Sequence, residues 1–246
     1  KGYEVTLIDR CNHIGGRARV FEREGFRHDA GPTVITAPFL FEELFALFNE
    51  KFSDHVRLVP LTPWYRFAFR DGSRYDYGGT LEQTLAEIRR IEPRDVEGYL
   101  ALLRHSQRIF DVGFTQLSAQ PFHRLWTMLR QIPSLLRLRS HETVWQMVSR
   151  FLCSPKLRRA FSIQPLLVGG NPFDTTSIYG LIHYLERAYG VHFAMGGTGA
   201  ITRALEDLMR RQGVRILLDT TVSALQVSGK RAEAVILADG TVMAAD

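Results

Sequence analysis

A short apolar run near the start of the chain ends in an acidic residue that could bind a nucleotide. The run is Val5 to Ile8, and Asp9 follows it directly. In a dinucleotide-binding βαβ unit, a strand of this kind ends in Asp or Glu, whose carboxylate accepts hydrogen bonds from ribose hydroxyls. The pattern also fits any buried parallel strand that ends in a capping Asp. The strand and its acid alone leave both interpretations open.

Two glycines follow this acid at a spacing that favours a phosphate-bearing cofactor. Gly15 and Gly16 let backbone amides approach a pyrophosphate or ribityl chain closely, and Arg17 supplies a charge that offsets the phosphates. A strand, an acid and Gly-Gly-Arg six residues later is similar to the segment that follows the dinucleotide fold of amine-oxidase-like flavoproteins. We therefore predict that Asp9, Arg10 and the Gly15-Gly16-Arg17 turn contact FAD.

The elements that position these residues can be predicted from spacing and turn signals. After a loop-rich segment with a hairpin near Gly25, a helix is predicted over 42–52, with Leu44, Phe45, Leu47 and Phe48 on one face. Strands are predicted at 56–61, 65–69 and 73–77, the last two joined by an Asp-Gly turn. Residues 81 to about 189 are predicted to form several short helices, because prolines interrupt them.

The last part of the chain predicts one helix, one buried strand and a meander. The helix spans 198–212, with Thr198 as its cap and Gly213 at its end. A buried strand at 214–218 and a meander of strands at 221–227, 232–237 and 241–244 follow.

Together with the resemblance to amine-oxidase-like flavoproteins, these elements predict an α/β fold: an incomplete Rossmann-like FAD-binding domain with an inserted mixed sheet and a helical substrate and membrane domain. The predicted FAD-binding parts are residues 1–56 and 190–246, and the mainly helical, substrate- and membrane-associated region is 57–189.

Composition narrows the class of protein. The 246 residues are 45% hydrophobic, which is ample for a buried core, and the net charge of +5 favours an anionic partner such as phospholipid or nucleic acid. Cys11 and Cys153 lie far apart without a CxxC motif, which argues against a disulfide framework or a zinc site. No apolar run approaches the roughly 20 residues that span a bilayer, so we expect any membrane contact to be peripheral.

Three longer motifs carry a family resemblance. Gly25 to Val34 resembles the segment by which phytoene desaturases and related flavoproteins approach the isoalloxazine ring. Leu166 to Phe173 and Pro93 to Tyr99 are more particular to bacterial and fungal carotenoid desaturases. The glycine-rich run Gly196 to Gly199 resembles the start of the second flavin-domain stretch of this superfamily. The resemblance covers the whole chain, and about half of such an enzyme.

The resemblance implies an FAD-dependent desaturation of phytoene, or a close carotenoid precursor, toward lycopene-type carotenes. It adds Gly31, Pro32, Thr33 and the backbone of Val222 to the expected cofactor contacts. It also implies an apolar carotenoid substrate and reoxidation of the flavin by quinone or oxygen. We expect the chain to be an internal piece of a longer enzyme, inactive by itself, with a cytoplasmic location on the inner face of the cell membrane.

One stretch of the sequence is predicted to contact the membrane. Residues 112 to 141 contain neither Asp nor Glu. The stretch has four arginines among leucines and Trp126: Arg124, Arg130, Arg137 and Arg139. Such a mixture suits a helix lying on anionic lipid. An ordinary core helix with solvated arginines is the alternative.

No side chain can be assigned to catalysis from the sequence. The eight histidines show no metal-ligand spacing, and no serine or cysteine has the context of a nucleophile, so we predict no metal. Alternatives inside the class are another carotenoid desaturase or a carotenoid isomerase. A cationic lipid- or nucleic-acid-binding module without redox activity is the alternative outside it. Because no nucleic-acid-binding motif is present, we expect no nucleic-acid partner.

Overall fold

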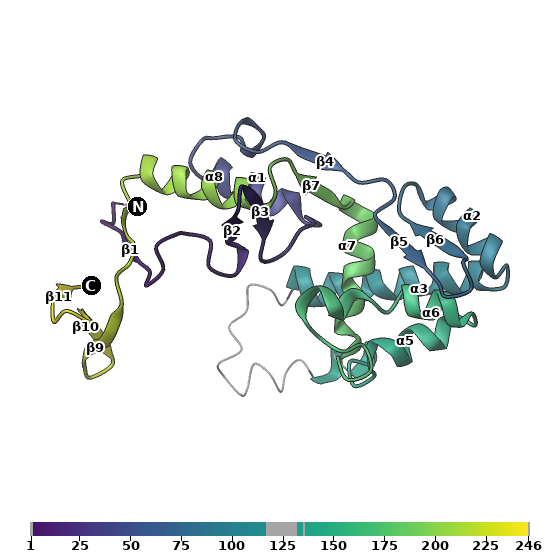
Figure 1. Cartoon of the computed structure of the whole chain (residues 1–246). Coiled ribbons are helices and arrows are strands. Elements are labelled where there is room, and N and C mark those ends of the chain that lie inside the picture. The colour runs from purple at the N-terminus through teal and green to yellow at the C-terminus, as the bar shows by residue number, and fades with distance from the viewer. Residues whose placement is uncertain (1, 117–131, 135, 246) are drawn as a thin grey trace. The chain divides into compact units, whose positions relative to one another are not determined.

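The structure is a computed structural model that describes residues 2–116, 132–134 and 136–245 (Figure 1). Its internal contacts divide the chain into two units. Unit 1 contains Lys1–Val34, Leu44–Val59 and Phe193–Asp246, and unit 2 contains Ile35–Glu43 and Pro60–His192. The assignment of a cofactor region and a substrate region, with the boundaries given above, stays a prediction.

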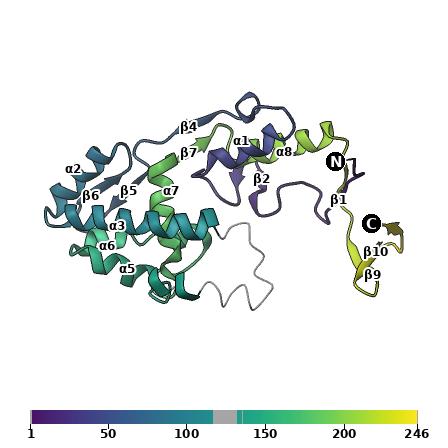
Figure 2. The same ribbon diagram turned by 180° about the vertical axis from the view of Figure 1, so that it is seen from behind.

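Unit 1 contains a parallel pair formed by two of the predicted strands. β1 (Thr6–Ile8) pairs in parallel with β8 (Arg215–Leu217), with Leu7 opposite Ile216. β9 (Val222–Ser228), β10 (Arg231–Leu237) and β11 (Val242–Ala244) form the predicted antiparallel meander, and both views show β9 and β10 near the C-terminus (Figures 1 and 2). These strands place Asp9 at the carboxyl end of a parallel pair.

A hairpin and a helix complete the part of unit 1 that matters for the site. β2 (Val20–Arg23) and β3 (Phe26–Asp29) pair through a turn in which Glu24 and Gly25 have φ values of 52° and 80°, as the sequence predicts. α8 (Thr198–Arg211) buries Ile201, Ala204 and Leu208, which lie on one face at helical spacing. Gly213, with a φ of 80°, follows the end of this helix.

The helix predicted over 42–52 is wrong in its bounds, and most of its predicted apolar face is exposed. α1 spans Pro38–Ala46, so it begins four residues earlier and ends six residues earlier. Phe45 is fully buried and packs on Phe52 and His55, whereas Leu47 is 77% exposed. Asn49 has a φ of 58°, a left-handed conformation that a helix cannot continue through. The apolar spacing therefore extends past the point where the backbone turns.

Unit 2 is mainly helical and packs around one core. Its helices are α2 (Leu81–Ile91), α3 (Asp95–Phe110), α5 (Val144–Phe151), α6 (Pro155–Ala160) and α7 (Leu181–Tyr189). β5 (Tyr65–Ala68) and β6 (Arg74–Tyr77) form the predicted hairpin. β4 (Leu58–Pro60) and β7 (His192–Ala194), most of whose residues belong to unit 1, pair with each other.

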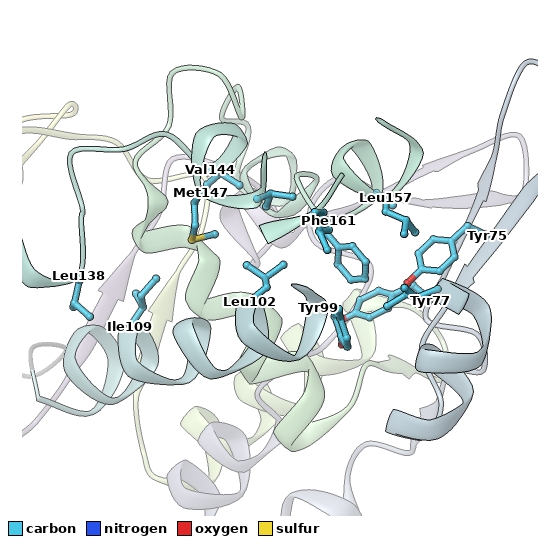
Figure 3. Close-up of a cluster of buried hydrophobic side chains, with 14 residues drawn as sticks. Tyr75, Tyr77, Tyr99, Leu102, Ile109, Leu138, Val144, Met147, Leu157 and Phe161 are labelled. Atoms are coloured by element: carbon cyan, nitrogen blue, oxygen red, sulfur yellow. The ribbon is translucent and has the colours of Figure 1, made fainter. Parts of the chain in front are cut away.

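The core of unit 2 joins α3, α5, α6 and the β5–β6 hairpin. Tyr99 and Leu102 project from α3 toward Phe161, and Tyr75 and Tyr77 reach the same cluster from β6 (Figure 3). The ring of Phe161 contacts the rings of Tyr75, Tyr77 and Tyr99 at centroid distances of 5.8, 5.2 and 4.9 Å. Aromatic contacts of this kind stabilise a core beyond the burial of apolar area.

Reciprocal caps fix where two of these helices begin. Thr80 accepts a hydrogen bond from the Gln83 backbone N–H, and its own N–H donates to the Gln83 side chain. Thr143 and Gln146 repeat this arrangement at the start of α5. Each capping box satisfies N–H groups that a helix start leaves without partners. The several short helices predicted for this region are confirmed.

Within the described residues, no helix has both the length and the apolar character needed to cross a membrane. Much of the stretch predicted to meet the membrane, including Arg124, Trp126 and Arg130, lies outside the described residues. Of its described part, Ile132 and Leu136 are 43% and 60% exposed, whereas Leu138 is buried in the core of unit 2.

Candidate functional site

Asp9 lies where a ribose-binding acid is expected. Its backbone N–H donates to Leu217 of the neighbouring strand, and its backbone carbonyl accepts from Thr220. Its Oδ1 accepts from the backbone N–H of Cys11 at 2.8 Å, and this bond keeps the pKa of the Asp9 carboxyl below its usual value. The half-exposed carboxylate is therefore ionised at neutral pH and can accept hydrogen bonds from hydroxyl groups. Arg10 beside it is exposed.

The two glycines form a turn that requires glycine. Gly15 and Gly16 have φ values of 105° and 51°, and a short 3-10 helix over Gly16–Ala18 follows. A Cβ at position 16 would meet no atom within 4 Å, so the backbone there borders open space. Arg17 is exposed beside it. The pyrophosphate or ribityl chain of a cofactor could thus approach the backbone at Gly16 closely, as the motif predicts.

The Gly31-Pro32-Thr33 segment lies against this turn. A Cβ at Gly31 would overlap the backbone carbonyl oxygen of Arg17, so no larger residue fits there. The backbone N–H of Ala30 donates to the carbonyl of Arg19 at 3.0 Å. Pro32 and Thr33 are exposed. The structure therefore brings two of the predicted cofactor segments together.

The start of α8 corrects one prediction from the sequence. Thr198 is the first helical residue and does not cap the helix, because the capping position is occupied by Gly197. The Thr198 backbone N–H instead donates to Oδ2 of Asp29 at 3.0 Å, and the Thr198 hydroxyl donates to the carbonyl of Pro32. Asp29 is thus the residue that satisfies the helix start. Its position at the end of a strand, three residues before Pro32, was the only signal available in the sequence.

Val222 begins β9, two residues after Thr220, whose N–H bonds to Asp9. It is 42% exposed. The predicted cofactor residues of unit 1 therefore fall into two neighbourhoods. One is Asp9 with the start of β9, and the other is the Gly15 to Arg17 turn with Gly31 to Thr33.

These residues fit a dinucleotide cofactor. They offer an ionised acceptor at the end of a parallel strand, a glycine with open space where a side chain would stand and a loop with no room for a side chain. A cavity of about 530 Å³ also lies in unit 1, lined by residues that include His13, Phe21 and Arg203. None of the predicted cofactor residues lines it, so it adds nothing to the placement of FAD.

Unit 2 contains a chain of buried polar side chains. Tyr65 donates to Oε1 of Glu186 at 2.8 Å, and the Gln164 side chain neighbours the same carboxyl. Gln164 Nε2 lies 3.0 Å from Nδ1 of His183, whose Nε2 lies 2.7 Å from the carbonyl oxygen of Phe161. Burial lowers the pKa of His183 to about 4, so the ring is neutral. Its Nε2 then carries the proton and donates to Phe161, and Nδ1 accepts from Gln164.

This arrangement favours a neutral Glu186. Burial raises the pKa of Glu186 to about 7, against the opposing effect of the hydrogen bond from Tyr65. Among the described residues, Oε2 of Glu186 and Oε1 of Gln164 both lack a hydrogen-bond partner. A proton on Oε2 would give Glu186 a hydrogen to donate and would remove a charge that burial disfavours.

The motif from Pro93 to Tyr99 has a structural explanation. The buried carboxylate of Asp95 accepts from the backbone N–H groups of Cys153 and Ser154, at 2.6 and 2.8 Å. A Cβ at Gly98 would overlap the carbonyl oxygen of Phe151, and Tyr99 is fully buried. This motif thus holds α3 against the segment before α6.

The motif from Leu166 to Phe173 instead presents an apolar surface. Leu166, Val168 and Phe173 are 60%, 56% and 56% exposed. Within the described residues, no group of three or more His, Cys, Asp or Glu side chains could hold a metal ion.

The fold and these motifs define an FAD-binding α/β protein of the oxidoreductase class. A family comparison is more specific: the "Flavin containing amine oxidoreductase" family matches residues 1–246, so the chain belongs to that family. The membership confirms the predicted fold class and FAD as the cofactor. The individual contact residues stay predictions.

The curated relatives are carotenoid enzymes. The chain is 44% identical over its whole length to the lycopene-forming phytoene desaturase of Pseudescherichia vulneris and 43% identical over 97% of its length to that of Pantoea ananas. It is 36% identical over its whole length to the neurosporene-forming phytoene desaturase of Rhodobacter capsulatus. The chain covers 50%, 49% and 47% of these three proteins, so it spans about half the length of the relatives it matches.

Solved structures show the same fold. A double mutant of putrescine oxidase matches with a TM-score of 0.60 at 13% identity, over 99% of this chain and 51% of that one. At this identity the match concerns the fold alone.

Proposed function

We propose that this chain is part of an FAD-dependent enzyme that desaturates phytoene, or a close carotenoid precursor, toward lycopene-type carotenes. The observation that carries the proposal is the similarity to phytoene desaturases along the entire chain, at up to 44% identity. The geometry of unit 1 supports it, because the residues expected to hold FAD gather in two neighbourhoods of that unit.

The residues of the chain would divide the task of holding the cofactor. The Asp9 carboxylate would accept from the adenosine ribose hydroxyls, with the backbone at Val222 beside the adenine. The amides at Gly15 and Gly16, with Arg17, would face the pyrophosphate or ribityl chain, and Gly31 to Thr33 would border the flavin ring. When bound, the flavin supplies the hydride acceptor for the desaturation. The protein orients the substrate and excludes water from it.

Conversion of phytoene by the full-length protein tests this function. Purified protein with FAD, phytoene-containing liposomes and a quinone or oxygen as acceptor should yield more conjugated carotenes, which absorb at longer wavelength. Chromatography of the products identifies how many double bonds were added. A flavin-loaded protein that leaves phytoene unchanged with either acceptor would contradict the proposal.

The product is the point on which the relatives differ. Both lycopene-forming and neurosporene-forming enzymes are similar to this chain, so a different number of desaturation steps is the second candidate. The greater identity to the lycopene-forming relatives favours lycopene. Membership in an oxidoreductase family is evidence against the alternative of a non-catalytic cationic module.

The remaining parts of the proposal concern the partners. An apolar carotenoid has to be taken from a lipid phase, so we place the enzyme at the inner face of the cell membrane, bound peripherally from the cytoplasm. Quinone or oxygen is the proposed electron acceptor. The exposed Ile132, Leu136 and Arg137 support contact between the acid-free stretch and lipid.

A further inference from the structure

Two hydrogen bonds from one residue hold both ends of a short loop. The Thr198 backbone N–H donates to Asp29, and the Thr198 hydroxyl donates to the carbonyl of Pro32. Asp29 and Pro32 flank Ala30 and Gly31, so this segment is fastened to the first turn of α8 at each side. Thr198 is only 6% exposed, and water therefore competes little for these bonds.

The surroundings leave the Asp29 carboxylate little freedom. A Cβ on Gly197 would lie 2.5 Å from its Oδ2 and 2.8 Å from its Oδ1, so glycine is needed for the carboxylate to reach the helix start. Gly197 has a φ of 75°, which other residues rarely adopt. Within the Gly196 to Gly199 motif, Gly197 is thus explained by contact with Asp29. It does not leave the start of α8 open for a phosphate, because an acidic side chain already occupies it.

We propose that Asp29 is a positioning residue for FAD, which sets the place of the Gly31-Pro32-Thr33 loop without touching the cofactor. The inference rests on the proposed flavin site at that loop. Its physical basis is pre-organisation: a loop that is already held in place loses less conformational freedom when the cofactor binds. Loss of the Asp29 acceptor leaves the Thr198 N–H unpaired and frees the loop, so FAD should bind more weakly.

The test compares FAD affinity and loop exchange in three variants of the full-length protein. Asp29→Ala should weaken FAD binding by about tenfold, the effect of losing a helix-capping acceptor. Asp29→Asn keeps an oxygen acceptor in the same place and should restore most of the affinity. Ile201→Val is a buried change on the same helix that costs comparable stability and leaves both Thr198 hydrogen bonds intact. It should leave FAD affinity within about twofold of wild type.

Hydrogen exchange supplies a second readout that a general loss of stability would not reproduce. In the apoprotein, the amides of residues 30, 31, 33 and 34 should exchange faster in Asp29→Ala than in Ile201→Val. If Asp29→Ala does not fold, Thr198→Ala removes only the bond to Pro32 and should show a smaller effect in the same direction.

The outcomes separate this inference from the proposed function. A wild-type protein that binds no FAD would defeat the proposed function itself. Wild-type affinity in Asp29→Ala, or equal losses in Asp29→Ala and Ile201→Val, would overturn the positioning role. Asp29→Asn behaving like Asp29→Ala would show that the charge matters, which would also overturn positioning through an acceptor.

Discussion

Single residues decide whether the glycine turn can accept a cofactor. Gly16 and Gly72 have the same two properties: a positive φ, at 51° and 79°, and open space where a Cβ would point. Only Gly16 lies in the predicted FAD site, since Gly72 is in the β5–β6 turn. Substitutions at the two positions therefore cause similar backbone strain, but only a substitution at Gly16 should disturb contact with the cofactor.

Gly16→Val should weaken FAD binding by tenfold or more, because a β-branched side chain would fill the space that the cofactor needs. Gly72→Val carries a similar backbone strain, on the order of 1–2 kcal/mol, and should leave FAD affinity close to wild type. Titration of apoprotein with FAD, followed by flavin fluorescence, measures both. Equal affinities in the two variants would remove Gly16 from the site.

The buried carboxyl of Glu186 predicts a dependence of stability on pH. Its folded pKa is about 7, against an ordinary value of 4.5. A raised pKa in the folded state contributes stability that is fully present below pH 4.5 and is lost as the pH rises through 7. The difference between the two values corresponds to about 3 kcal/mol across that window.

Glu186→Gln should remove this dependence, because an amide resembles the neutral acid: its oxygen can accept from Tyr65, and its NH₂ group can donate. Unfolding in urea at pH 5.5 and 8.5 measures the effect. The variant should be close to wild type at the lower pH and more stable at the higher one. Glu142→Gln is the control, since Glu142 pairs with Arg139 and Arg150 and its loss should not stabilise the protein at pH 8.5. A wild-type protein equally stable at both pH values would contradict a neutral Glu186.

At the scale of elements, turn chemistry was the most reliable guide from sequence. The hairpins at Gly25 and Gly72 and the meander turn at Gly229 were predictable because positive φ values select glycine. The bounds of α1 were not, because apolar spacing continues past Asn49, where the backbone changes hand. The bond from Thr198 to Asp29 joins residues 169 apart, and no local pattern in a single sequence records such a contact.

The acid-free stretch gives a prediction that belongs to this scale. Changing Arg124, Arg130, Arg137 and Arg139 to Gln should lower binding to anionic liposomes at low salt, by up to about 1 kcal/mol per charge. Arg139 should contribute least, because it is paired with Glu142 at 3.0 Å. Salt should weaken the binding of the wild type without abolishing it, since apolar insertion is not screened.

A matched variant removes the same charge elsewhere. Arg27, Arg70, Arg94 and Arg210 are exposed and lie outside the stretch, and their change to Gln should affect liposome binding less. FAD content should stay unchanged when the arginines of the stretch are replaced. Equal sedimentation of both variants with liposomes would favour the core-helix interpretation.

At the scale of the whole molecule, the chain spans about half of its relatives, and this predicts how a protein made of these residues alone behaves. Within the described residues, β1 has one neighbouring strand, β8. We expect residues 1–246 by themselves to bind FAD poorly and to be inactive, because the pyrophosphate of a dinucleotide is normally held at a glycine turn that leads into an α-helix, and the described residues next to β1 do not form one. Calorimetry with FAD tests this, and micromolar or tighter binding would disprove it.

The pairing of β1 with β8 also sets an order of events on the ribosome. Thr6 lies opposite Arg215, so about 200 residues are made after β1 before its partner β8 is complete. At roughly 5–20 residues per second, that wait lasts about 10 to 40 seconds. Most of unit 2 leaves the ribosome during this time and can close its aromatic core, while the edge of β1 that pairs with β8 stays open to other partners. The β1–β8 pair therefore forms after most of unit 2 has been made, and its formation should depend on chaperones and growth temperature more than that of the helical core.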